Sequence, residues 1–149
     1  MTSIRLTKEF RFEMAHALWN YDGLCRNLHG HSYILRVTVK GMPNADANHP
    51  KCGMVMDFGE LKAIVKDEIL DRLDHAILVS DRAPVNDIAN LSQMAERLIV
   101  VDYQPTCENM LVDFAQRIAA RLPERVMLHS LRLNETATSY AEWFAEDNG

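Results

Sequence analysis

The stretch HSYILRVTVK, residues 31–40, decides the fold class, because its apolar and polar side chains alternate. Alternation with a period of two is typical of a β-strand that is buried on one face. Residues 4–16 alternate in the same way, and His16 continues their apolar phase. The two segments predict an antiparallel pair of strands joined by a long loop, residues 17–30.

The segments that follow predict further strands and two helices. MVMDF, residues 54–58, is a candidate third strand, and Asp57 with Glu60 forms a capping box for a helix. LIVVDY predicts a short buried strand, preceded by a possible helical turn near residues 91–97.

The last third of the chain predicts a second helix and a closing strand. Thr106 is the expected N-cap of the helix, and Pro123 lies just past its end. RVMLHSLRLNETATSY, residues 125–140, is expected to form a single strand. The order of elements favours an α+β fold with an antiparallel sheet. With no repeat or linker, residues 1–149 are expected to form one domain.

Composition excludes several function classes. The net charge is −5 and no basic run offsets it, so we expect neither nucleic-acid nor membrane-surface binding. No apolar run approaches the roughly 18 residues of a spanning helix, and the charged start is unlike a secretory signal. Three cysteines without a Cys-x-x-Cys pair do not suggest a disulfide framework. A cytoplasmic protein is the expectation.

Three histidines form a candidate metal site. His29 and His31 are two residues apart, so in a strand their side chains leave the same face. His16 ends the partner strand in the same phase. An open site of three imidazoles suits Zn²⁺, with the fourth position free for water or substrate. Alternatively, these are partly buried histidines that hydrogen-bond to the backbone.

Two further groups are candidates for proton transfer. Cys25 lies four residues before His29, and a nearby cation would lower the pKa of its thiol. It can equally be a fourth metal ligand or a small apolar side chain. Asp74 precedes His75 and can fix the tautomer of an imidazole, although an exposed helix end explains the pair as well. We interpret the other two cysteines as structural.

Glu135 is a candidate ligand-binding carboxylate, because it shares the phase of apolar Leu131 and Leu133. An inward carboxylate requires a partner, and a ligand with two parallel N–H donors would match it. If the strand ends earlier, Glu135 is simply solvated. Glu108 falls in a first helical turn, where an acid is already favoured by the helix dipole.

The order of these motifs resembles the 6-pyruvoyltetrahydropterin synthase family. FEMAHAL, CRNLHGHSY, GMVMDFGELK, LDHAIL, PTCENM and LNETATSY occur in succession, and the resemblance spans about residues 7–140. It implies the tunnelling fold, a four-stranded antiparallel sheet with two helices on one face. Subunits of that fold assemble into a barrel, usually as two stacked trimers. A homohexamer with active sites between subunits is therefore implied.

The resemblance also implies roles for individual residues. Cys25 matches the family's catalytic cysteine, and Asp74 with His75 matches its aspartate–histidine pair. Glu135 matches the glutamate that holds the pterin edge, and Thr106 and Glu108 fall in the segment framing the pocket. The positions that match the family's zinc ligands are His16, His29 and His31.

The implied substrate is 7,8-dihydroneopterin triphosphate. The short Cys-x₃-His-Gly-His spacing resembles the bacterial carboxy-forming branch, which serves queuosine biosynthesis and releases 6-carboxy-5,6,7,8-tetrahydropterin, acetaldehyde and triphosphate. The alternative is the pyruvoyl-forming branch, which eliminates triphosphate from the same substrate. Arg26, Lys51 and Arg82 are candidate triphosphate contacts.

Two other classes of protein remain alternatives. A zinc hydrolase would use the three histidines to activate water, but it would have no need of Cys25. A non-catalytic pterin-binding member of the same fold would be expected to lack Cys25 or His75, and both are present.

Overall fold

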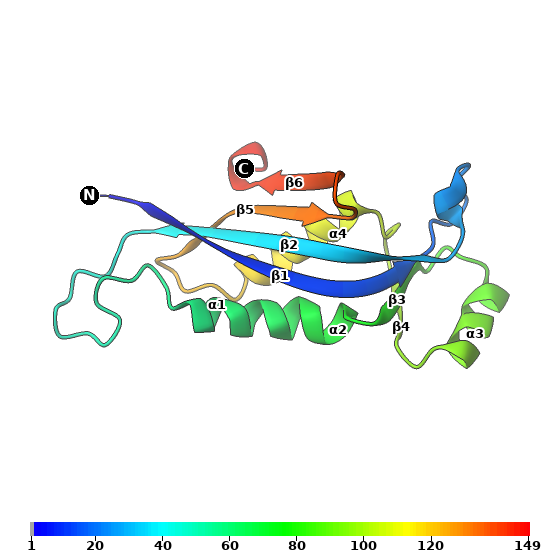
Figure 1. Ribbon diagram of the computed structural model, residues 1–149, viewed down its shortest axis with the longest axis horizontal. Coiled ribbons are helices and arrows are strands. Elements are labelled where there is room, and N and C mark those ends of the chain that lie inside the picture. The colour runs from blue at the N-terminus through cyan, green and yellow to red at the C-terminus, as the bar shows by residue number, and fades with distance from the viewer. Residues whose placement is uncertain (1) are drawn as a thin grey trace.

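The computed structural model describes residues 2–149 and contains one six-stranded mixed sheet with the strand order β4-β3-β1-β2-β5-β6 (Figure 1). The strands are β1 (Ile4–His16), β2 (His29–Gly41), β3 (Ala76–Ser80), β4 (Leu98–Val101), β5 (Met127–Asn134) and β6 (Tyr140–Phe144). The α-helices are α1 (Phe58–Val65), α2 (Asp71–Leu73), α3 (Val85–Met94) and α4 (Cys107–Ala119). A π-helical segment, Lys66–Leu70, connects α1 to α2, and short 3₁₀ turns occupy Leu24–Arg26 and Ala145–Asp147.

The long pair of strands predicted from the alternating segments is confirmed. β1 and β2 run antiparallel over their whole length, with Ile4 opposite Gly41 at one end and His16 opposite His29 at the other. β2 begins two residues earlier than predicted, at His29, so the connecting loop covers residues 17–28. Both paired histidines therefore lie within regular strand backbone.

The prediction of a four-stranded antiparallel sheet is only partly correct. β1, β2, β5 and β6 do form four antiparallel strands, but β3 pairs parallel to β1 and β4 pairs parallel to β3. β3 reads AILVS, and four of its five residues are buried. A short parallel strand buried on both faces lacks the alternation by which strands are recognised.

Two segment predictions are wrong. Residues 54–58 form no strand, because Asp57 already caps α1 and the preceding residues follow a turn at Gly53, where φ is +84°. Val55 and Met56 are nevertheless buried, which explains their apolar character. The single closing strand is divided into β5 and β6 by a turn in which Glu135 N–H donates to Ser139 O (3.0 Å).

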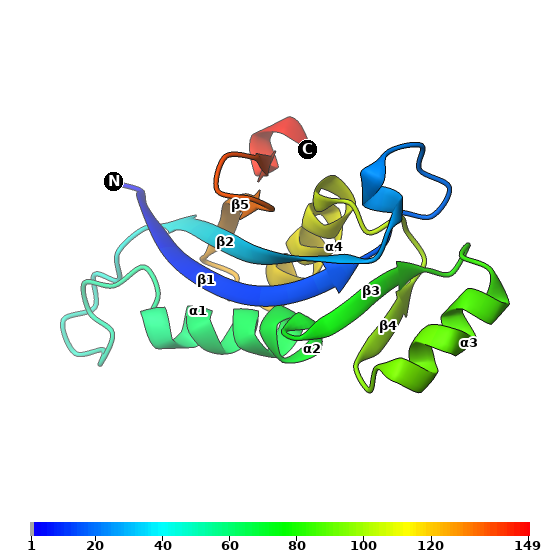
Figure 2. The ribbon, with the colours of Figure 1, turned by 45° about the vertical axis from the view of Figure 1, so that its right-hand side comes forward.

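Helices α1 and α4 cover one face of the sheet, and their predicted caps are confirmed. Asp57 Oδ1 accepts from Gly59 N–H (2.7 Å), and Thr106 Oγ1 accepts from Asn109 N–H (3.2 Å). The possible helical turn before β4 is α3, which starts six residues earlier than predicted and stands apart from the sheet (Figure 2). Apolar residues of β1, β2 and β5 pack against α1 and α4 in a single core centred on Phe12, Tyr33 and Phe114.

In the part of the chain that the structure describes, no helix covers the other face of the long strands (Figure 1). Its side chains include Glu9, Arg11, Glu13 and Arg36, which are exposed or partly exposed. Within residues 2–149, no helix is both long enough and apolar enough to cross a membrane.

Candidate metal centre and neighbouring pockets

Strand register brings His16, His29 and His31 together on the helix-covered face. His16 lies directly opposite His29, and His31 lies two residues farther along β2 on the same face. The ring centroids are 4.6 Å apart for His16 and His29, 4.8 Å for His29 and His31, and 5.2 Å for His16 and His31. The predicted convergence of three imidazoles is therefore present in the fold.

Backbone carbonyls orient two of the rings. His16 Nδ1 lies 2.7 Å from Pro105 O, and His29 Nδ1 lies 2.6 Å from Asn27 O. A carbonyl only accepts, so Nδ1 of each ring carries a proton and the neutral ring presents a lone pair at Nε2. The two Nε2 atoms face each other at 3.1 Å. Backbone carbonyls commonly orient metal-binding histidines in this way, through the ring nitrogen that does not bind the metal.

Burial favours the neutral, metal-binding form of His16 and of His31. It lowers the pKa of His16, which is fully buried, and also lowers that of His31, although Glu135 acts in the opposite direction. His31 Nε2 is buried without a hydrogen-bond partner. One ligand atom from each histidine lies within 4.8 Å of the others. Converging lone pairs of this kind fit a metal cation, so the cluster can hold one.

Glu135 reaches the histidine cluster from the turn after β5. Its Oε1 atom lies 3.3 Å from His16 Nε2 and 3.3 Å from His31 Nε2, and its side chain is 28% exposed. Glu135 also lines an open cavity of about 380 Å³ together with Glu108 and residues of β6. Thr106, the cap of α4, directly precedes Cys107, which also lines this cavity. Two of the three predicted substrate residues, Glu135 and Glu108, therefore line one pocket, and Thr106 is next to it in sequence.

Cys25 lies in the loop that leads into β2. It belongs to the 3₁₀ turn Leu24–Arg26 and is exposed, and its carbonyl accepts from Leu18 N–H (3.1 Å), which closes the base of the loop. Cys107 is buried, and its thiol donates to Leu133 O (3.2 Å). Burial raises the pKa of the Cys107 thiol to about 11, so this thiol stays protonated.

The Asp74–His75 pair lies elsewhere. His75 has a left-handed backbone (φ +63°), and its Nδ1 atom is 3.1 Å from Asp74 Oδ1. Asp74 Oδ1 also accepts from Glu13 N–H (2.9 Å), which fixes the carboxylate. The imidazole is 74% exposed, so it is accessible to a molecule outside the chain.

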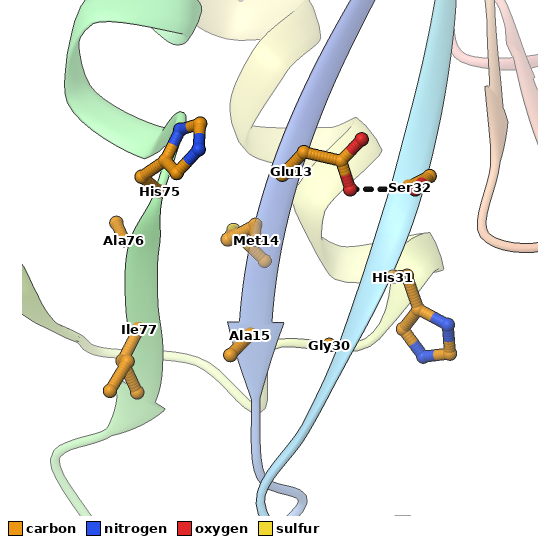
Figure 3. Close-up of a pocket in the computed structure, with 9 residues that line it drawn as sticks. All are labelled: Glu13, Met14, Ala15, Gly30, His31, Ser32, His75, Ala76 and Ile77. Atoms are coloured by element: carbon orange, nitrogen blue, oxygen red, sulfur yellow. Dashed lines mark hydrogen bonds between the residues drawn. The ribbon is translucent and has the colours of Figure 1, made fainter.

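His75 borders a cavity of about 330 Å³ that includes Glu13 and Ser32. These two side chains alternate with the buried histidines and so lie on the uncovered face of the sheet. Figure 3 shows Ser32 hydrogen-bonded to Glu13 and the His31 ring pointing away from His75. Within one chain, the Asp74–His75 pair and the histidine cluster therefore lie on opposite faces of the sheet.

Sequence reasoning missed the groups that position the site. The carbonyls of Asn27 and Pro105 leave no signal in a sequence, because every residue carries one. The carboxamide of Gln104 bonds to the backbone of Trp19, across 85 positions of the chain. Among the candidate triphosphate contacts, Lys51 already pairs with Asp57 at 2.6 Å. Arg82 borders a polar cavity of about 470 Å³ that also includes Trp19 and Gln104.

Comparison with known proteins identifies relatives of the whole chain. The family model described as 6-pyruvoyl tetrahydropterin synthase matches residues 5–146. The 6-carboxy-5,6,7,8-tetrahydropterin synthase of Haemophilus influenzae is 39% identical, over 93% of this chain and 97% of its own length. The enzyme of the same description from Synechocystis is 37% identical, over 93% of this chain and 91% of its own length.

Solved structures share the fold. A crystal structure of an uncharacterized protein from Wolinella succinogenes superimposes with a TM-score of 0.80 and 21% identity, covering 97% of this chain and 99% of the other. The 6-pyruvoyl tetrahydropterin synthase of Caenorhabditis elegans superimposes with a TM-score of 0.69 and 21% identity, covering 97% of both chains.

Proposed function

Because the chain belongs to the 6-pyruvoyl tetrahydropterin synthase family, we propose that it is a 6-carboxy-5,6,7,8-tetrahydropterin synthase, a lyase of queuosine biosynthesis. It converts 7,8-dihydroneopterin triphosphate to 6-carboxy-5,6,7,8-tetrahydropterin, acetaldehyde and triphosphate. The observation that carries this proposal is the three-histidine cluster beside the pocket of Glu135. The relatives at 39% and 37% identity support the carboxy-forming branch.

His16, His29 and His31 would hold Zn²⁺, the ion that suits three neutral imidazoles. When bound, zinc supplies Lewis-acid stabilisation for the charge that develops on the substrate's side-chain oxygens. The carbonyls of Pro105 and Asn27 keep the imidazoles in the tautomer that binds a cation.

Glu135 would hold the pterin ring. An ionised carboxylate accepts two parallel N–H bonds, and the 2-amino group and N3–H of a pterin offer such a pair. The cavity at Glu135 is open and bordered by Glu108 and Tyr140, so a planar ring can enter it. Thr106, which caps α4 beside this cavity, would help to define its rim.

Cys25 and His75 would transfer protons at the substrate side chain. The Asp74 carboxylate, 3.1 Å from His75 Nδ1, would fix the orientation of the ring for this task. Because His75 lies on the opposite face of the sheet from the histidine cluster, it would serve the site of a neighbouring subunit in a homohexamer. The exposure of both the thiol and the imidazole supports such a shared site.

A product assay tests the proposal. The zinc-loaded protein is incubated with 7,8-dihydroneopterin triphosphate, and the products are identified by mass spectrometry. We expect 6-carboxytetrahydropterin together with acetaldehyde. 6-Pyruvoyltetrahydropterin would instead assign the chain to the pyruvoyl-forming branch with the same site residues. Absence of any pterin product would contradict the proposal. A cytoplasmic location for the domain 1–149 is part of the same proposal.

A further inference from the structure

We infer that Glu135 is a fourth ligand of the metal in the substrate-free protein, and that it leaves the metal when a pterin ring enters the pocket. This inference rests on the proposed function for the identity of the ring. It gives one carboxylate two alternating partners, the metal and the pterin.

The distances around Glu135 match one corner of a tetrahedron. Ligand atoms about 2.0–2.1 Å from a tetrahedral zinc are about 3.3–3.4 Å from one another. Glu135 Oε1 lies 3.3 Å from His16 Nε2 and 3.3 Å from His31 Nε2. His16 Nε2 lies 3.1 Å from His29 Nε2. The two edges that end at Glu135 Oε1 therefore have the length that a shared cation requires, and the edge between His16 and His29 is slightly shorter.

Hydrogen bonding does not explain the same contacts. Glu135 Oε1 and His16 Nε2 are 3.3 Å apart but lack the geometry of a hydrogen bond. His31 Nε2 likewise makes no hydrogen bond, although Glu135 Oε1 is only 3.3 Å away.

The position of Glu135 allows its carboxylate to change partner. The residue starts the turn between β5 and β6, where its N–H donates to Ser139 O. Its side chain is partly exposed and borders the open cavity of about 380 Å³. A carboxylate bound to the metal cannot at the same time offer both oxygens to a ring in that cavity. Entry of the ring would thus free one metal position for the substrate side chain.

Two measurements on the metal-loaded protein test this inference. The first is zinc affinity, determined by competition with a chelator in wild type and three variants. Glu135→Gln should weaken zinc binding by about 10–100-fold, the range known for altered metal surroundings. Glu135→Asp keeps the charge but is shorter, and should resemble Glu135→Gln. Glu108→Gln, in the same cavity but with no contact to the histidines, should bind zinc like wild type.

The second measurement is the visible absorption spectrum of the Co²⁺-substituted protein. The probe is 6-methylpterin, which has the ring but lacks the side-chain hydroxyl groups. Its addition should shift the wild-type spectrum towards that of Glu135→Gln, and should leave the spectrum of that variant unchanged.

Wild-type zinc affinity and an unchanged Co²⁺ spectrum in Glu135→Gln would overturn metal ligation by Glu135. If the Co²⁺ spectrum of the wild type does not change when 6-methylpterin binds, Glu135 does not move from the metal to the pterin, and the exchange of partners is overturned. Both readouts are independent of turnover. If the product assay on the wild type fails but Glu135→Gln still weakens zinc binding, the proposed function is contradicted and metal ligation by Glu135 is not.

Discussion

The side chain of Gln104 forms two hydrogen bonds with the backbone of Trp19. Its Nε2 atom donates to Trp19 O (2.7 Å), and its Oε1 atom accepts from Trp19 N–H (3.2 Å). Trp19 follows Leu18, whose N–H donates to the carbonyl of Cys25. Gln104 itself precedes Pro105, whose carbonyl orients His16. The carboxamide of Gln104 thus attaches the loop that carries Cys25 to the segment whose carbonyl orients His16.

Replacing Gln104 with methionine should loosen this loop without removing the metal. The side chain keeps its length but loses both hydrogen bonds, so we expect faster amide exchange at Leu18 and Trp19. Turnover should fall by at least about tenfold with little change in KM, because a misplaced catalytic group slows the chemical step more than binding. NMR-detected exchange, metal analysis and steady-state kinetics measure these effects.

Gln116→Met is the matched control, since Gln116 is exposed on α4 and makes no side-chain hydrogen bond among the described residues. It should behave like wild type in all three measurements. Equal exchange and turnover in wild type and Gln104→Met would show that the two hydrogen bonds do not position the loop.

Cys25→Ala should retain zinc and lose turnover, whereas His31→Ala should lose both. Cys25 lies outside the histidine cluster, and His31 contributes one of its three ligand atoms. Zinc content by elemental analysis, measured beside the product assay, separates the two effects. Cys52→Ala, at an exposed cysteine of another loop, is the control. Full activity of Cys25→Ala would contradict its role in proton transfer, and loss of zinc would make it a ligand.

The metal-free protein should become less stable as the pH falls below about 6.5, the ordinary histidine value. Burial lowers the pKa of His16 and His31 in the folded state, so the unfolded chain takes up protons first. The free energy of unfolding therefore has its full value above about pH 6.5. It decreases as the pH falls from there to the lowered pKa values of the folded state. Each histidine contributes at most about 1.4 kcal/mol per pH unit.

Thermal unfolding between pH 7.5 and 5.5 measures this dependence. Burial also lowers the pKa of His129, which is remote from the histidine cluster. Its protonation therefore also decreases the stability as the pH falls. The His129→Gln variant therefore isolates the contribution of the cluster. A melting temperature that does not decrease over this range in that variant would rule out the neutral, buried state of His16.

Mixed oligomers should show whether one site uses two chains. Cys25→Ala and His75→Ala should each be inactive, because each lacks one of the two groups that we propose to transfer protons. After dissociation and reassembly together, some interfaces would combine the intact His75 of one chain with the intact Cys25 of another. Activity should then reappear, at up to about one quarter of wild type for random pairing. Persistent inactivity of verified mixed oligomers would place both groups in a site within one chain.

Much of the architecture could be predicted from local patterns. Two alternating stretches predict β1 and β2, and capping residues predict where α1 and α4 begin, since both signals depend on residues close together in sequence. β3 could not be recognised, because a short strand buried on both faces does not alternate. The division between β5 and β6 was missed because the turn at Glu135 contains neither glycine nor proline.

By itself, the sequence identified the candidate metal ligands and the candidate proton-transfer groups, and it predicted that His16, His29 and His31 would share one face of the sheet. Spacing suffices there, because side chains alternate along every strand. Only the tertiary structure decided the surroundings of those residues. It set His16 opposite His29, brought Glu135 within 3.3 Å of two imidazoles, and placed His75 on the opposite face. These contacts join segments distant in sequence, so they depend on strand register and on packing against α4, which no local pattern encodes.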